Sequence, residues 1–201
     1  MTRRRVELQR RALRLEYATI GWNIGEAFLT IGLGLAAASL ALIGFGIDSI
    51  IEVFASVVVV WHLVPQHETD RPERTRVALR LVSAAFIGLS IVLATMAVRD
   101  LATGRRPGES LWGIVYLGLT ACVMFALGVA KQRTATRLDS APLRSEAKVT
   151  FLDAALAAGT LIGLSLNAAL GWWWADPLAA LIVAVAALNE ARETWVESSV
   201  V

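Results

Sequence analysis

The sequence has few of the residues from which cysteine and histidine chemistry is built. Cys122 is the only cysteine among the 201 residues, so the chain forms neither an internal disulfide nor a cysteine-based metal cluster. Histidine occurs only at His62 and His67, where surface positions are the simplest interpretation. The apolar runs contain no His-Glu-x-x-His motif, paired Ser/His site or Gly-rich phosphate loop. These absences argue against a membrane-embedded enzyme.

Charged residues are also scarce. They make up 18% of the chain, whereas soluble domains contain about 25%. The hydrophobic share is 56% and the mean hydropathy is +0.60. The net charge of +2 does not indicate nucleic-acid binding, because the basic residues separate apolar runs and form no stripe on a soluble surface. No cleavable signal peptide is evident, because the apolar stretch after the basic amino end is too long for one. The composition indicates an integral membrane protein.

Six apolar runs are long enough to cross a bilayer, for which about 20 residues suffice. They cover residues 17–38, 39–63, 77–98, 110–129, 146–170 and 175–196. A Gly-rich stretch over residues 36–46 is predicted to form a tight hairpin between the first two runs, and residues 131–144 are predicted to form a polar linker. We therefore expect an all-α integral membrane protein whose six transmembrane helices form a bundle.

Three segments are expected within this architecture. Residues 1–16 are predicted to be a basic amino-terminal segment, residues 17–196 the transmembrane domain and residues 197–201 a short tail. With six spans, 16 of the 19 lysines and arginines fall on the side of the termini, and 3 fall on the other side. The positive-inside rule places the richer side in the cytoplasm. Both termini are therefore expected to be cytoplasmic, in the inner membrane if the protein is prokaryotic.

Carboxylates inside the apolar runs are the most informative residues. An ionised carboxylate at the centre of a bilayer costs about 3 kcal/mol on insertion scales, so it needs a polar interior, a cation or a proton. Asp48 and Glu52 are four residues apart, so they share one helix face within about 40° and would repel each other. A metal ion or a shared proton would resolve that repulsion. Glu26 and Asp153 lie in other runs, and Glu146 lies at the entry to the fifth.

Structural roles for the same acids stay open at this stage. Asp48 and Glu52 could form a polar knot with Asn23 or with a neighbouring helix. Glu26 could support the fold rather than bind a ligand, and Glu146 could be a first-turn acid favoured by the helix dipole. Two glycine pairs, Gly21/Gly25 and Gly159/Gly163, have the spacing of closely packed helices. Asp176 precedes Pro177, which is typical of a helix start with Asp as N-cap.

The motifs resemble those of the cation diffusion facilitator family. The stretch IDSIIEVFAS at residues 47–56 is similar to the metal-site helix of that family. Glu146-Ala147 followed by Asp153 is similar to its fifth span, and GWWWADPLAA at residues 171–180 is similar to the opening of its sixth. Asn23 also matches the pattern of the first span. The resemblance covers residues 15–195.

The resemblance implies a six-helix antiporter that moves a divalent cation, usually zinc, out of the cytosol in exchange for protons. Its transport site would combine Asp48, Glu52 and Asp153. The fourth family position is Val149, which cannot bind a metal, so Glu26 or Glu146 could supply the missing ligand. Zn²⁺ is the expected substrate. Because the set contains only oxygen ligands, Mn²⁺ or Mg²⁺ would suit it, and Fe²⁺ or Co²⁺ are further alternatives.

The resemblance also implies a homodimer in the lipid bilayer. The family's cytoplasmic carboxy-terminal metal-sensing domain is not expected here, as in the shorter branch of vesicular zinc transporters. We expect alternating access, with metal and protons competing for the same carboxylates. The alternative hypothesis is a non-transporting membrane subunit whose buried acids only hold helices together.

Overall fold

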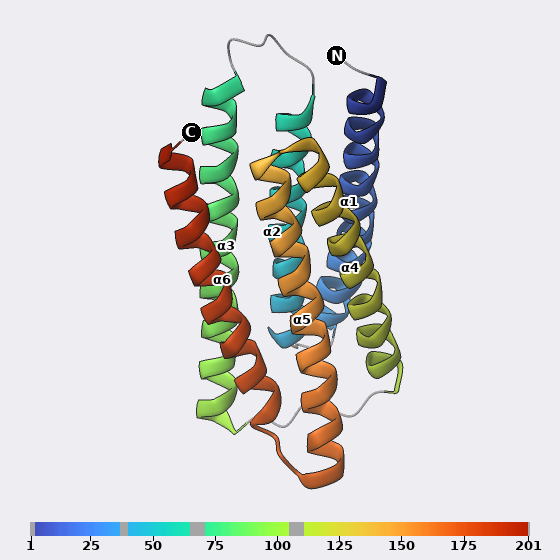
Figure 1. Ribbon diagram of the computed structural model, residues 1–201. Coiled ribbons are helices and arrows are strands. Elements are labelled where there is room, and N and C mark those ends of the chain that lie inside the picture. The colour runs from blue at the N-terminus through green and yellow to red at the C-terminus, as the bar shows by residue number, and fades with distance from the viewer. Residues whose placement is uncertain (1–2, 37–39, 65–70, 105–110, 201) are drawn as a thin grey trace.

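The computed structural model describes residues 3–36, 40–64, 71–104 and 111–200. The regular structure in these ranges is helical throughout. Its elements are α1 (Arg3–Ala36), α2 (Leu40–Leu63), α3 (Arg71–Thr103), α4 (Leu111–Leu138), α5 (Ala141–Leu170) and α6 (Ala175–Val200). The helices run side by side in one bundle, and α1 begins at the end of the bundle where α6 finishes (Figure 1). The predicted all-α membrane bundle of six helices is confirmed.

Four helices in the described ranges contain stretches long and apolar enough to cross a membrane, judged by length and composition. These stretches are Phe45–Leu63, Pro72–Thr103, Val115–Leu138 and Ala141–Asn167. The described parts of α1 and α6 do not reach the same apolarity. Polar residues explain this, because α1 begins in an arginine-rich segment and α6 carries Glu190, Arg192 and Glu193 in its second half.

Helix ends depart from the predicted boundaries where charged residues extend the helices. The prediction of a polar linker over residues 131–144 is wrong, because α4 continues to Leu138 and α5 begins at Ala141. Residues 3–16 of the basic segment belong to α1, α3 begins at residue 71, and α6 continues through the predicted tail to Val200. Lysine, arginine and glutamate are good helix formers, so a helix can continue beyond the apolar run that it contains. The run therefore predicts the membrane-spanning stretch but not the ends of the helix. Part of the predicted hairpin, residues 37–39, lies outside the described residues.

The helices associate mainly in pairs. Helix α1 packs along α2, α4 along α5, and α3 along α6, whereas α1 and α4, and likewise α2 and α5, contact each other much less extensively. Four helices thus form a group made of two pairs, α1–α2 and α4–α5. The α3–α6 pair packs on one side of this group, through α2 and α5.

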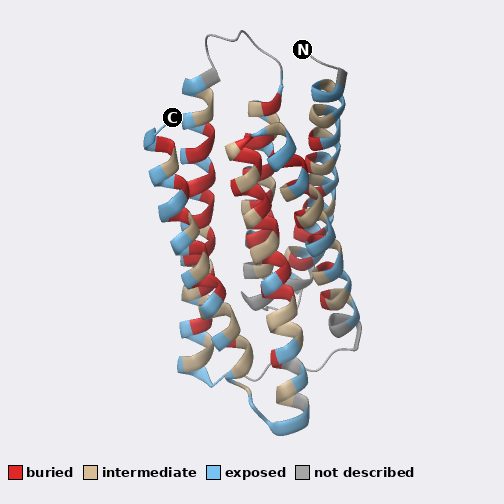
Figure 2. Ribbon diagram, viewed as in Figure 1, coloured by how far each residue is buried: buried red, intermediate tan, exposed pale blue. Residues whose placement is uncertain are grey.

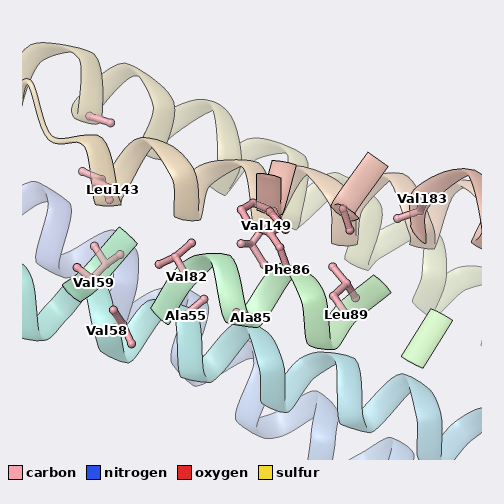
Figure 3. Close-up of a cluster of buried hydrophobic side chains, with 14 of the residues drawn as sticks. Ala55, Val58, Val59, Val82, Ala85, Phe86, Leu89, Leu143, Val149 and Val183 are labelled. Carbon is pink, nitrogen blue, oxygen red and sulfur yellow. The ribbon is translucent and has the colours of Figure 1, made fainter. Parts of the chain in front are cut away.

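An apolar cluster joins the α3–α6 pair to the other helices. Figure 3 shows Val59 of α2, Val82 and Phe86 of α3 and Val149 of α5 within this cluster. Buried positions follow the inward faces of the helices, and exposed positions follow the outward faces (Figure 2). The exposed faces are rich in large hydrophobic side chains, among them Phe28, which is 78% exposed. Such a surface suits contact with lipid.

Only one of the two predicted glycine pairs contacts another helix of this chain. A Cβ atom at Gly163 would lie 2.6 Å from Cα of Asp176, and one at Gly159 would lie 2.9 Å from Cβ of Ala179. The close approach of α5 and the start of α6 therefore depends on these glycines. Nothing lies within 4 Å of such an atom at Gly21 or Gly25, so the predicted close packing there is absent from the described contacts.

Candidate functional site

Five predicted site residues are buried inside the bundle. Glu26 of α1, Asp48 and Glu52 of α2, and Asp153 of α5 are each at most 4% exposed, and Glu146 of α5 is fully buried. Each acid shares a helix face with other buried polar residues, and this face is turned toward the interior. On α2 this face runs through Ser49, Glu52 and Ser56, all of which are buried.

Glu52 and Asp153 face each other between α2 and α5. Burial separates Asp153 from water, and the strongest charge acting on it is that of Glu52, followed by those of Asp48 and Glu26. Glu52 also lies within hydrogen-bonding reach of Asp153. Among the described residues, neither oxygen of Glu52 has a hydrogen-bond partner, and Asp153 Oδ2 has none. Two acids in this arrangement need a shared proton or a cation.

Glu26 of α1 lies near Asp153 and contacts α4. Tyr116 donates a hydrogen bond of 2.7 Å to Glu26 Oε1, and the Thr120 hydroxyl lies 3.5 Å from the same atom. Glu26 Oε2 has no hydrogen-bond partner among the described residues, and neither has Asn23 Oδ1. After Glu52, Glu26 is the charged group that acts most strongly on Asp48. One oxygen of Glu26 is therefore committed to α4 and the other is free to bind.

Glu146 belongs to a different set of contacts. Lys131 of α4 lies with its Nζ 2.5 Å from Glu146 Oε1, and Ser56 of α2 donates a hydrogen bond of 2.9 Å to the same oxygen. Lys131 also donates to Thr150 over 3.1 Å, and its Nζ lies 3.4 Å from Glu16 Oε2. The described structure thus places Glu146 beside an internal cation and not beside Asp153.

Sequence reasoning missed Glu16 and Lys131, although both are fully buried. The sequence places Glu16 in the basic amino-terminal segment and Lys131 in a polar stretch, so neither is expected in the interior. Glu16 can be recognised from the spacing of polar residues at the period of an α-helix. It begins a buried polar stripe on α1 that continues through Thr19, Asn23, Glu26 and Thr30, at the spacing of one helix face.

The carboxylates are spread along the bundle axis. In the described parts of the chain, no three Asp, Glu, His or Cys side chains lie close enough together to hold one metal ion. Val149, at the position of the missing fourth ligand, lies in the apolar cluster with Phe86 (Figure 3). A cation on Glu52 and Asp153 would therefore need a third oxygen, and Asp48 is the nearest source in the sequence.

Comparison with known proteins identifies the family. The family model described as the cation efflux transmembrane domain matches residues 17–201. The chain belongs to the cation efflux family. The match reaches all six helices of the bundle. The predicted resemblance to the cation diffusion facilitator family is confirmed.

One relative of this cation efflux protein is the uncharacterized transporter sll1263 of Synechocystis. The two are 24% identical over 170 residues, which cover 79% of this chain and 55% of the relative. The matched region thus spans about half the length of that relative. The name of that relative describes it as a transporter and gives no substrate.

Proposed function

We propose that this cation efflux protein exports a divalent metal ion, zinc or a similar ion, in exchange for protons. The ion binds between α2 and α5, on Glu52 and Asp153, with Asp48 as the third ligand. Glu26 Oε2 is available on the outer side of the same space. The observation that carries this proposal is the pair of facing, buried carboxylates, in which both Glu52 oxygens and Asp153 Oδ2 lack hydrogen-bond partners among the described residues.

The ligand chemistry supports a substrate range wider than zinc. All the proposed ligands are carboxylate oxygens, and Val149 supplies none. Oxygen ligands suit Mn²⁺ and Mg²⁺, and Zn²⁺, Fe²⁺ and Co²⁺ also accept carboxylates. Because no three acids lie together as described, binding must draw Asp48 toward the Glu52–Asp153 pair. We therefore expect metal binding to be coupled to a change in the packing of α2 against α5.

Competition for the same oxygens would couple metal to protons. A carboxylate binds a metal ion only after it loses its proton, so binding releases protons and protonation releases metal. Exchange across the membrane follows if the site opens to one side when protonated and to the other when loaded. The 16-to-3 distribution of basic residues supports cytoplasmic termini. The family resemblance supports a homodimer, which crosslinking in lipid nanodiscs would test.

A transport assay tests this proposal. Proteoliposomes are loaded with a metal-sensitive dye and a pH dye and are then exposed to Zn²⁺, Mn²⁺, Fe²⁺, Co²⁺ and Mg²⁺ in turn. Asp153→Asn and Glu52→Gln keep the side-chain shapes but remove the charges, and should abolish metal uptake and the accompanying proton flux. The matched control is Glu193→Gln on α6, a residue that is more than half exposed and lies outside the bundle interior.

The assay also separates this proposal from the alternative hypothesis. A non-transporting subunit with structural acids would show no saturable metal binding in the unaltered protein. The absence of a three-acid cluster in the described residues is the observation that favours that alternative. Saturable binding that both Asp153→Asn and Glu52→Gln remove would exclude it. Unchanged transport in both variants would overturn the proposed site.

A further inference from the structure

The two helix pairs around the carboxylates touch each other through few polar contacts. One pair is α1–α2 and the other is α4–α5. Hydrogen bonds and ion pairs within a pair hold two neighbouring helices, whereas contacts between the pairs close the space that contains Glu52 and Asp153. Apart from the approach of Glu52 to Asp153 itself, the polar contacts between the pairs in the described ranges occur at two levels of the bundle.

The first level lies toward the end of the bundle that carries the termini. There Lys131 of α4 approaches Glu16 of α1 to 3.4 Å, and Ser56 of α2 donates to Glu146 of α5 over 2.9 Å. The side chains of Lys131, Glu16 and Glu146 have no exposed surface. Ser56 is one helical turn from Glu52, on its terminal side. Lys131 is the charged group that acts most strongly on Glu52, so this level lies near the site.

The second level lies toward the opposite end. Tyr116 of α4 donates its 2.7 Å hydrogen bond to Glu26 of α1, with Thr120 beside it. Glu16 and Glu26 are about 15 Å apart along α1, at 1.5 Å per residue. Tyr116 and Lys131 are about 22 Å apart along α4 on the same basis. The Glu52–Asp153 pair lies between the two levels, because the charges of both Lys131 and Glu26 act on Glu52, and that of Glu26 also acts on Asp153.

We propose that these contacts are two latches that close the carboxylate site on its two sides. The inner latch is the approach of Lys131 to Glu16, and the outer latch is the hydrogen bond from Tyr116 to Glu26. This inference rests on the proposed function, because it assigns the latches to the path of the transported ion. With both latches closed the site is occluded, which agrees with exposures of at most 4% for Asp48, Glu52 and Asp153.

Lys131 makes two contacts at the inner latch, a shorter one to Glu146 within the α4–α5 pair and a longer one to Glu16 between the pairs. Lys131 is bound to Glu146 at 2.5 Å within the α4–α5 pair, with Thr150 as a further acceptor. Its approach to Glu16 is longer, and neither Glu16 oxygen makes a hydrogen bond to the described residues. Separation of the two pairs at this level would leave Lys131 neutralised by Glu146. The ammonium can therefore open the path without becoming an unpaired buried charge.

Accessibility of a buried cysteine from each side of the membrane tests the latches. The background is Cys122→Ser, which removes the only native thiol. The reporter is Ser49→Cys, because Ser49 is 4% exposed and lies beside Glu26. Sealed vesicles of known orientation are treated from one side with a positively charged, membrane-impermeant methanethiosulfonate reagent. In this background the reporter should react slowly from both sides.

Each latch variant should raise the rate from one side only. Glu16→Gln removes the inner ion pair but leaves Lys131 paired with Glu146, and should speed labelling at least fivefold from the side of the termini. Tyr116→Phe removes the outer hydrogen bond and should do the same from the opposite side. Glu193→Gln, on the outside of the bundle, should change neither rate. If Glu16→Gln does not fold, Glu16→Asp withdraws the carboxylate by one methylene and carries the same expectation.

Two results would overturn the latches. One is an unchanged rate from the expected side in a folded variant, and the other is an equal increase from both sides, which would show general loosening. The readout does not depend on transport. If the latch variants show side-specific labelling but the unaltered protein transports no metal, the latches stand and the proposed function is wrong. If Asp153→Asn abolishes transport but the latch variants label at the unaltered rate, the proposed function stands and the latches are wrong.

Discussion

Lys131 on α4 lies 2.5 Å from Glu146 on α5, and neither side chain has any exposed surface. Glu16 adds a second carboxylate 3.4 Å from the same ammonium. Removing one partner of such a pair leaves a buried charge without compensation, which costs about 3–5 kcal/mol. The pair therefore makes one arrangement of α4 and α5 much more stable than arrangements that would separate the two charges.

A double-mutant cycle should reveal this coupling. Lys131→Met should lower the free energy of unfolding by about 3 kcal/mol, because Glu16 and Glu146 lose their cation. Lys131→Met with Glu146→Gln should cost less than the sum of the single changes, by about 1 kcal/mol or more. Chemical unfolding in micelles measures both values. The control is Lys148→Met, whose pair with Glu190 is partly exposed and should contribute less than about 1 kcal/mol. Equal costs at residues 131 and 148 would contradict the prediction.

A glycine at the α5–α6 contact should tolerate no larger residue. Gly163→Ala would place a methyl group 2.6 Å from Cα of Asp176, so α6 must move, at a cost of about 1–3 kcal/mol. Gly21→Ala is the matched control, because it has nothing within 4 Å. It should leave the stability unchanged or raise it by up to about 1 kcal/mol. The midpoint of thermal unfolding in detergent compares the two. A lower midpoint for Gly21→Ala than for Gly163→Ala would show that the contact is misplaced.

The sequence was sufficient to predict the features that depend on local hydrophobicity. The six helices and the interior positions of Glu26, Asp48, Glu52 and Asp153 follow from apolar run length and from the cost of charge in a bilayer. The helix ends could not be predicted in this way. Residues such as Lys131 and Arg133 are polar enough to end an apolar run, yet they continue α4 because a helix needs no apolarity to persist.

The partners of the buried acids depend on contacts between helices that are distant in the sequence. Glu16 and Lys131 meet although 115 residues separate them, and nothing in either local pattern selects the other. The sequence is compatible with two roles for Glu146, a metal ligand or a first-turn acid. Its contacts with Lys131 and Ser56 give it a third role, which only the packing of α2, α4 and α5 determines.

Histidine at residue 149 should not complete the metal site. Val149 is 2% exposed and belongs to the apolar cluster that contains Phe86. Val149→His would bury imidazole nitrogens without partners, at a cost of about 1–3 kcal/mol, and should leave zinc affinity within about tenfold of its original value. Val149→Ala, which only removes packing, is the control for stability. Titration with Zn²⁺ decides the question, because affinity raised more than tenfold would show that residue 149 reaches the carboxylates.

Glu52 should govern both the affinity for metal and its dependence on pH. Glu52→Gln should weaken binding at least tenfold, or about 1.4 kcal/mol, because one negative oxygen ligand is lost. Glu52→Asp keeps the charge with a shorter reach and should weaken binding less. Since metal and protons compete for the same oxygens, affinity in the unaltered protein should rise with pH, and Glu52→Gln should reduce that slope because one displaceable proton is gone. Metal titrations at several pH values measure both quantities. A weaker affinity with an unchanged slope would mean that Glu52 attracts the ion without exchanging a proton for it.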